Sequence, residues 1–159
     1  MSESVVKPGR VDSDGGRARA ARVGGAIAIL AMALVVYGAY GDTHPKASQK
    51  SAVPFLIIAV AVVATVVYAL LAPLALRAVE SGAAAAARWA VGLTVVSLVS
   101  LVVFWSGLPL IVGGAAALVG KTGREQANGS RAFSAAWGLG LFAAGASIAV
   151  TILGNTIGR

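Results

Sequence analysis

Apolar residues in this chain fall in long runs, and the polar residues gather between those runs. The runs cover about residues 23–41, 53–76, 89–120 and 133–153. A soluble core does not need such runs, whereas a helix needs about 20 consecutive apolar residues to cross a bilayer. The pattern therefore predicts an all-α protein that is a polytopic transmembrane helical bundle.

The third apolar run is too long for one membrane span. As a single helix, residues 89–120 would extend about 48 Å at ~1.5 Å per residue, against a hydrocarbon core of about 30 Å. Tilting absorbs such a mismatch poorly. The segment Gly107-Leu108-Pro109 lies in the middle of the run and is typical of a turn. The run is thus predicted to be two spans, of which the second is short.

The distribution of Lys and Arg distinguishes five spans from four. With the N-terminus in the cytoplasm, five spans place ten of the 13 basic residues inside, and four spans place eight inside. Because cytoplasmic loops carry an excess of Lys and Arg, five spans fit better, with the C-terminus outside. We expect residues 1–22 to form a disordered, basic cytoplasmic tail. Residues 23–159 then form the membrane domain, with spans at about 23–41, 53–76, 89–105, 108–121 and 133–153.

Composition agrees with a membrane location and changes how the net charge is interpreted. Hydrophobic residues make up 58% of the chain and charged residues 12%, with a mean hydropathy of +0.85. In a soluble domain, about 45–50% of the residues are apolar and about 25% are charged. The net charge of +7 is explained by basic residues that flank spans and meet anionic headgroups. We expect a multi-pass plasma-membrane protein whose partner is the lipid bilayer, with a cytoplasmic N-terminus and no nucleic-acid partner.

Reactive side chains are scarce. The chain has no Cys, which excludes disulfides and thiolate metal sites, and its single histidine, His44, has too few neighbouring ligands for a metal site. Ionisable residues inside spans usually mark proton relays or substrate paths. Here all six acids lie in the tail or in loops: Glu3, Asp12, Asp14, Asp42, Glu80 and Glu125. The sequence predicts a protein that is not an enzyme, with no catalytic, metal or cofactor-binding residue and no identifiable small-molecule substrate.

Small residues four apart are the main candidates for a functional role. Helices in lipid associate by close packing, which small residues permit. The candidates pair as Gly113 with Ala117, Ala116 with Gly120, Gly140 with Ala144, and Gly145 with Ala149. They serve either packing within the chain or association with a second copy or another membrane protein. The leading hypothesis is therefore a helix-packing protein that assembles with itself or with an envelope complex.

Two serines support an alternative hypothesis. Ser97 and Ser100 are three residues apart and share one helix face. Their hydroxyls either bond within and between helices or line a polar path. If the hydroxyls line a polar path, the protein is a small transport or channel subunit.

The second half of the chain also carries a pattern of small and basic residues. A Gly/Pro break is followed by a Gly/Ala-rich helix, a basic loop and a second Gly/Ala-rich helix. The matching residues are Gly107-Leu108-Pro109, Gly113, Gly114, Gly120, Lys121, Arg124, Gly129, Arg131, Gly138 and Gly140. Over about residues 89–153, less than half of the chain, this pattern resembles small bacterial multi-span membrane domains of unknown function. The resemblance implies the helical break and brings no assigned activity.

Overall fold

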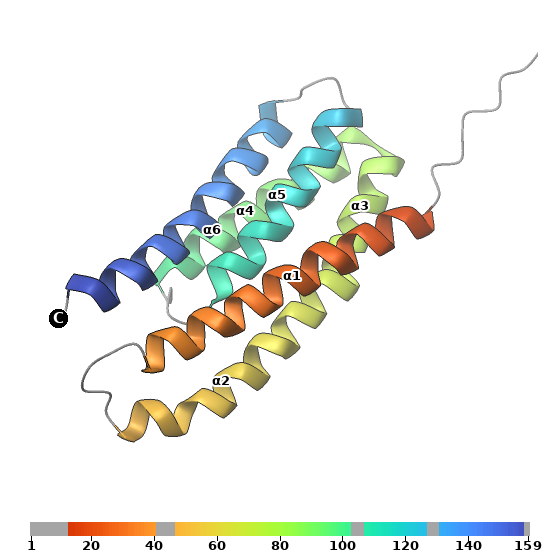
Figure 1. Ribbon diagram of the computed structural model, residues 1–159. Helices are drawn as coiled ribbons and strands as arrows, with labels where there is room; N and C mark the ends of the chain where they lie inside the picture. Colours follow the sequence, from red (N-terminus) through yellow and green to blue (C-terminus); the bar gives the residue numbers. More distant parts are fainter. Residues whose placement is uncertain (1–12, 41–46, 103–106, 127–130, 158–159) are drawn as a thin grey trace, which may run out of the picture.

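The computed structural model describes residues 13–40, 47–102, 107–126 and 131–157, and every long element in these ranges is a helix (Figure 1). The elements are α1 (Ser13–Tyr40), α2 (Ala47–Thr65), the π-helix η1 (Val66–Leu71), α3 (Ala72–Ser81), α4 (Ala83–Ser100), α5 (Leu108–Gln126) and α6 (Arg131–Ile157). Helices α2, η1 and α3 follow one another without a break. The described chain thus forms five long helical segments.

The five segments run alternately up and down (Figure 1). Each packs against the next: α1 on α2, α3 on α4, α4 on α5, and α5 on α6. The start of α1 and the end of α6 lie at opposite ends of the bundle. Three segments are long and apolar enough to cross a membrane, namely Gly15–Tyr40, Lys50–Val79 and Arg131–Gly154. The apolar part of α4, Ala84–Ser100, is shorter.

The long apolar run is two helices, as its Gly/Pro segment predicts. Helix α4 ends at Ser100 and α5 begins at Leu108. Gly107 has a φ of 72°, a left-handed conformation that favours glycine, and its carbonyl accepts a hydrogen bond of 3.2 Å from the Ile111 N–H. The break therefore depends on a backbone angle that other residues adopt only with strain.

The predicted cytoplasmic tail is shorter than expected. Helix α1 begins at Ser13, so residues 13–22 are helical and the prediction of disorder was wrong for them. The reason is local, because this segment is rich in Ala and Arg, both strong helix formers, and Ala20 is fully buried. Residues 1–12 lie outside the described residues.

The second segment continues past Pro73, although a proline usually kinks or ends a helix. Proline has no N–H and its ring collides with the carbonyl four residues earlier in an α-helix. Here the π-helix η1 directly precedes α3, and the Ala72 N–H bonds to Val67 O in the wider π register. The wide turn accommodates Pro73, and the helix ends only at Gly82, just before α4 begins.

Helix α5 is at the centre of the bundle. Twelve of its nineteen residues are buried, and it contacts α1, α3, α4 and α6. It also continues to Gln126, beyond the predicted end at residue 121. Its Gly and Ala residues give it a small cross-section, which lets the surrounding helices approach closely.

Candidate functional site

Small residues form a close contact between α5 and α6, which we call the α5–α6 seam. Its central residues are Gly113 and Ala117 of α5 and Gly140 and Ala144 of α6. A Cβ atom added at Gly113 would lie 2.7 Å from Gly140 O, and one added at Gly140 would lie 2.6 Å from Gly113 O and 2.8 Å from Ala117 N. The two backbones touch with no room for a methyl group. The predicted pair Gly113 with Ala117 and the predicted pair Gly140 with Ala144 therefore meet inside one chain.

The seam continues toward the start of α6. A Cβ atom at Gly120 would lie 2.5 Å from Trp137 N and 2.8 Å from Phe133 O, and one at Gly123 would overlap the Phe133 ring. Phe133 is fully buried there. Gly120 belongs to the predicted pair Ala116 with Gly120, and Ala116 is fully buried, so this pair also lies inside the chain. Gly123 was not among the predicted packing residues, although its spacing from Gly113 places it on the same side of the helix.

The predicted pair Gly145 with Ala149 lies outside this contact. A Cβ atom at Gly145 would meet nothing within 4 Å, and Ala149 is exposed. Gly138 is open in the same way, and Leu141 and Phe142 are 49% and 62% exposed beside them. The structure thus divides the candidate packing residues into an internal group and a group on the outer face of α6.

The hydroxyl groups of Ser97 and Ser100, the two serines of the alternative hypothesis, donate hydrogen bonds to backbone carbonyls of the helices. Ser97 is fully buried, and its hydroxyl donates to Pro109 O at 3.4 Å, which links α4 to α5. Ser100 donates to Val96 O within its own helix. In the described part of the chain, no buried side-chain nitrogen or oxygen lacks a hydrogen-bond partner. The serine hydroxyls therefore connect helices or bond back to their own helix.

Tyr68, which is not among the residues predicted from the sequence, packs between α1 and α5 from its position in η1. It lies in η1 and is 5% exposed, and its hydroxyl donates to Ile111 O of α5 at 3.1 Å. Its ring occupies the space where Gly24 of α1 has no side chain, because a Cβ there would lie 2.6 Å from Tyr68 Cβ. A Cβ at Gly114 would lie 2.6 Å from the Tyr68 hydroxyl. A lone Tyr inside an apolar run, shortly before a proline, was the available signal.

Basic residues gather at one end of the bundle. The α1 start, the α3–α4 turn and the α5–α6 turn lie at this end (Figure 1), which we call the basic end. It carries eight of the nine Lys and Arg residues of the described helices: Arg17, Arg19, Arg22, Arg77, Arg88, Lys121, Arg124 and Arg131. Only Lys50, at the start of α2, lies at the other end.

Aromatic side chains accompany the charges at both ends. The Arg124 guanidinium lies over the Trp137 ring, 4.9 Å from its centroid, and Lys50 lies 5.9 Å from the centre of the Tyr40 ring. Trp89 follows Arg88 directly in sequence and is 37% exposed. Tryptophan and tyrosine at the two ends of an apolar bundle are typical of membrane interfaces.

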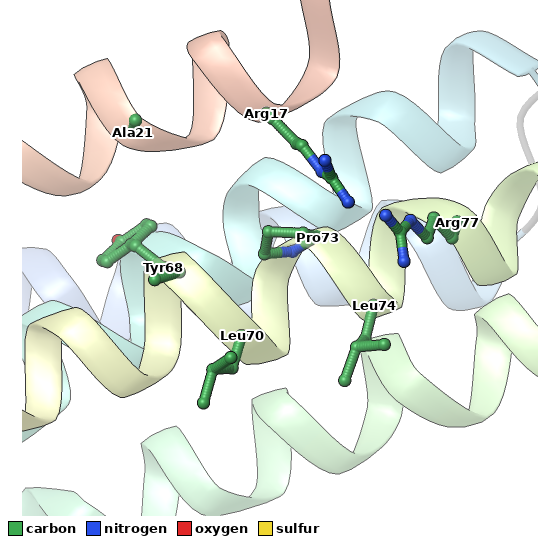
Figure 2. Close-up of a pocket in the computed structure, with 8 residues that line it drawn as sticks. Arg17, Ala21, Tyr68, Leu70, Pro73, Leu74 and Arg77 are labelled. Atoms are coloured by element: carbon green, nitrogen blue, oxygen red, sulfur yellow. The ribbon is translucent and has the colours of Figure 1, made fainter. Parts of the chain in front are cut away.

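A groove, here called the α1 groove, lies between α1 and the η1–α3 segment. Its upper part has a volume of 480 Å³ and is lined by Arg17, Ala21, Tyr68, Pro73, Leu74 and Arg77, among others (Figure 2). Its lower part has a volume of 300 Å³ and shares Ala21 and Tyr68 with the upper part, then continues along α1 to Met32. The two parts therefore form one groove that leads from two arginines into the apolar part of the bundle.

The described residues contain no candidate metal site, and the comparisons with known proteins identify no relative. No group of three or more His, Cys, Asp or Glu residues that could hold a metal lies in the described part of the chain, and His44 lies outside it. No protein-family model matches the chain, and no curated protein or solved structure matches it significantly. The resemblance of residues 89–153 to small bacterial membrane domains stays a prediction.

Proposed function

We propose that the chain is a five-pass plasma-membrane protein with a cytoplasmic N-terminus, and that it acts by assembly and not by catalysis. The observation that carries the topology is the segregation of charge, with eight basic side chains at one end of the described bundle and one at the other. Basic loops stay in the cytoplasm, so the basic end is the cytoplasmic end. The alternating direction of the five segments then places the C-terminus outside.

Helices α4 and α5, which are not among the three segments long and apolar enough to cross a membrane, are compatible with this topology. Helix α5 carries Lys121 and Arg124 in its last turns, at the basic end where headgroups and water are available. Its apolar part is enclosed by other helices. Helix α4 begins at Ala83 and carries Arg88 and Trp89 in its second turn at the same end, and a side chain as long as arginine reaches the interface from within a short helix. Bilayer thinning accommodates the remaining mismatch at a small cost.

A topology measurement tests the proposal. We expect a phosphatase domain, active only outside the cytoplasm, to work when fused at Arg159 and to stay inactive when fused after Gly82. A fluorescent reporter that matures only in the cytoplasm gives the opposite pattern. A control fusion in the loop between α1 and α2 has to behave like the fusion at Arg159. Phosphatase activity after Gly82, or none at Arg159, would contradict the five-pass arrangement.

The outer face of α6 supports the assembly role. Gly138, Gly145 and Ala149 recur at spacings that place them on one side of the helix, and Leu141 and Phe142 flank them. Small residues on a lipid-facing helix let a second helix approach closely, and the larger neighbours supply contact area. The internal glycines are already used in the α5–α6 seam, so the outer face is the one open to a partner. A second copy of the chain or another membrane protein fits this face.

Cross-linking of single-cysteine variants tests the assembly role, because the natural chain has no Cys. We expect Gly145→Cys or Ala149→Cys to give a disulfide-linked species with a second copy, or a bifunctional cross-link to another membrane protein, in native membranes. Ile58→Cys is the control, since Ile58 is 63% exposed on α2, away from this face. Equal or absent cross-linking at positions 145, 149 and 58 would rule the α6 face out. Cysteine at Gly113 or Gly140 would not serve, because it has no space in the seam.

A further inference from the structure

We propose that the α1 groove binds one anionic glycerophospholipid, with its phosphate between Arg17 and Arg77 and an acyl chain along α1. This rests on the proposed membrane topology, and it adds a specific ligand to it. The groove combines an elongated apolar cavity with two cationic groups at one end.

Two guanidinium groups from different helices meet at the mouth of the groove. Arg17 reaches from α1 toward Pro73, and the Arg77 guanidinium lies at the same end of the groove on α3 (Figure 2). Both side chains are exposed. Guanidinium groups recognise phosphate with paired, charge-assisted hydrogen bonds. Two of them also disfavour a headgroup that carries its own cation, so a net negative headgroup is selected.

The position and length of the groove fit a lipid in one leaflet. Arg17 and Arg77 belong to the basic end, where the proposed topology places the cytoplasmic headgroups. From Arg17 to Met32 the groove follows α1 for about 22 Å, at ~1.5 Å per residue. One leaflet of the hydrocarbon core is about 15 Å thick, half of the ~30 Å core. The groove therefore accommodates a headgroup and a chain of ordinary length.

Small residues make the floor of the groove. Its lower part is lined by Gly25 and Ala28 of α1 and by Ala61 and Thr65 of α2. The Thr65 hydroxyl donates to Ala61 O at 2.8 Å, so it presents an apolar surface to the groove. A Cβ atom at Gly25 would meet nothing within 4 Å. The cavity is thus open beside Gly25, and a larger side chain there would fill it without displacing the backbone.

Lipid retention in native mass spectrometry tests the proposal. The full chain is reconstituted in vesicles of equal phosphatidylglycerol and phosphatidylcholine, extracted in mild detergent, and its bound lipids are counted. We expect a single retained lipid with a phosphatidylglycerol preference of about tenfold or more, as two charge-assisted contacts imply. Arg17→Gln with Arg77→Gln should reduce the preference to near unity. Arg131→Gln is the matched control, because Arg131 lies at the same basic end and lines no part of the groove.

A second pair of variants tests the apolar part of the groove. We expect Gly25→Leu to remove the retained lipid while leaving the thermal midpoint in detergent unchanged or raised. Gly38→Leu, at another open glycine of α1, should keep wild-type retention. Soluble glycerol phosphate at millimolar concentration should not displace the lipid.

The outcomes that overturn the site differ from those that overturn the topology. An equal effect of Arg131→Gln, retention unchanged in Gly25→Leu, displacement by glycerol phosphate, or a dimer that disulfide-links through Gly25→Cys would each reject a lipid in this groove. Alkaline carbonate extraction separates the two proposals. A chain that leaves the membrane overturns the membrane function and the lipid site together. A chain that stays in the membrane without lipid preference overturns the site alone.

Discussion

Gly140→Leu is expected to prevent stable packing of α6 on α5. A Cβ atom at this position would lie 2.6 Å from Gly113 O, 2.8 Å from Ala117 N and 3.2 Å from Ala116 Cβ. Two of these three atoms belong to the α5 backbone, so no side-chain rotation relieves the overlap. Overpacking a tight core costs about 1–3 kcal/mol. We expect about that loss for Gly140→Ala and more than 3 kcal/mol for Gly140→Leu.

Denaturation in detergent micelles, followed by loss of helical packing or by protease sensitivity of α6, measures this loss. The matched control is Gly145→Leu, five residues further along the same helix, where a Cβ atom meets nothing within 4 Å. Because glycine is a poor helix former, Gly145→Leu should leave the monomer equally stable or slightly more stable. Equal destabilisation by the two variants would show that α6 does not pack on α5 through this seam.

Tyr68→Ala should destabilise the fold by about 3–5 kcal/mol, the range for emptying a buried aromatic site. Tyr68 is 5% exposed and fills the space between α1 and α5, where Gly24 and Gly114 leave room for its ring and hydroxyl. Tyr68→Phe should destabilise the fold much less than Tyr68→Ala does. It removes only the hydrogen bond to Ile111 O, and interhelical hydrogen bonds in membranes average about 0.6 kcal/mol. Thermal midpoints of the purified variants in one detergent measure both losses.

Tyr37→Ala is the control for this pair, since Tyr37 is 38% exposed on α1. It should shift the midpoint by less than Tyr68→Ala. A reciprocal effect is also expected at Gly24: Gly24→Ala is destabilising in the natural chain and better tolerated together with Tyr68→Ala. Additive losses in that double variant would contradict direct packing of Tyr68 on Gly24.

The sequence predicted the helical class and the main break well because both follow from local signals. Runs of about twenty apolar residues specify helices in lipid wherever they pack, and Gly107 with Pro109 interrupts a helix through backbone chemistry alone. Boundaries were less accurate. Helix α1 begins at Ser13, ahead of the first apolar residue of the predicted span, because helix propensity and the burial of Ala20 continue it into a charged segment. A hydropathy pattern contains neither the helix propensity of these residues nor the burial of Ala20.

The candidate packing residues show that sequence spacing does not determine which glycines lie in a helix–helix contact. Gly113, Gly140 and Gly145 have the same spacing pattern and the same chemistry, yet two lie in a backbone contact and one is open. Tyr68, Gly123 and the pairing of Arg17 with Arg77 were not predicted, because each depends on helices that are distant in sequence.

By itself, then, the sequence determined that this protein is a bundle of apolar helices, how the long run divides, and that reactive groups are scarce. These properties depend on composition and on the conformational preferences of single residues. Only the tertiary structure decided which small residues are internal, that α5 is the central helix, and that eight basic side chains share one end. The physical reason is that the rotation of each helix about its axis is set by its neighbours through close packing, since an apolar face in lipid is not directed by water.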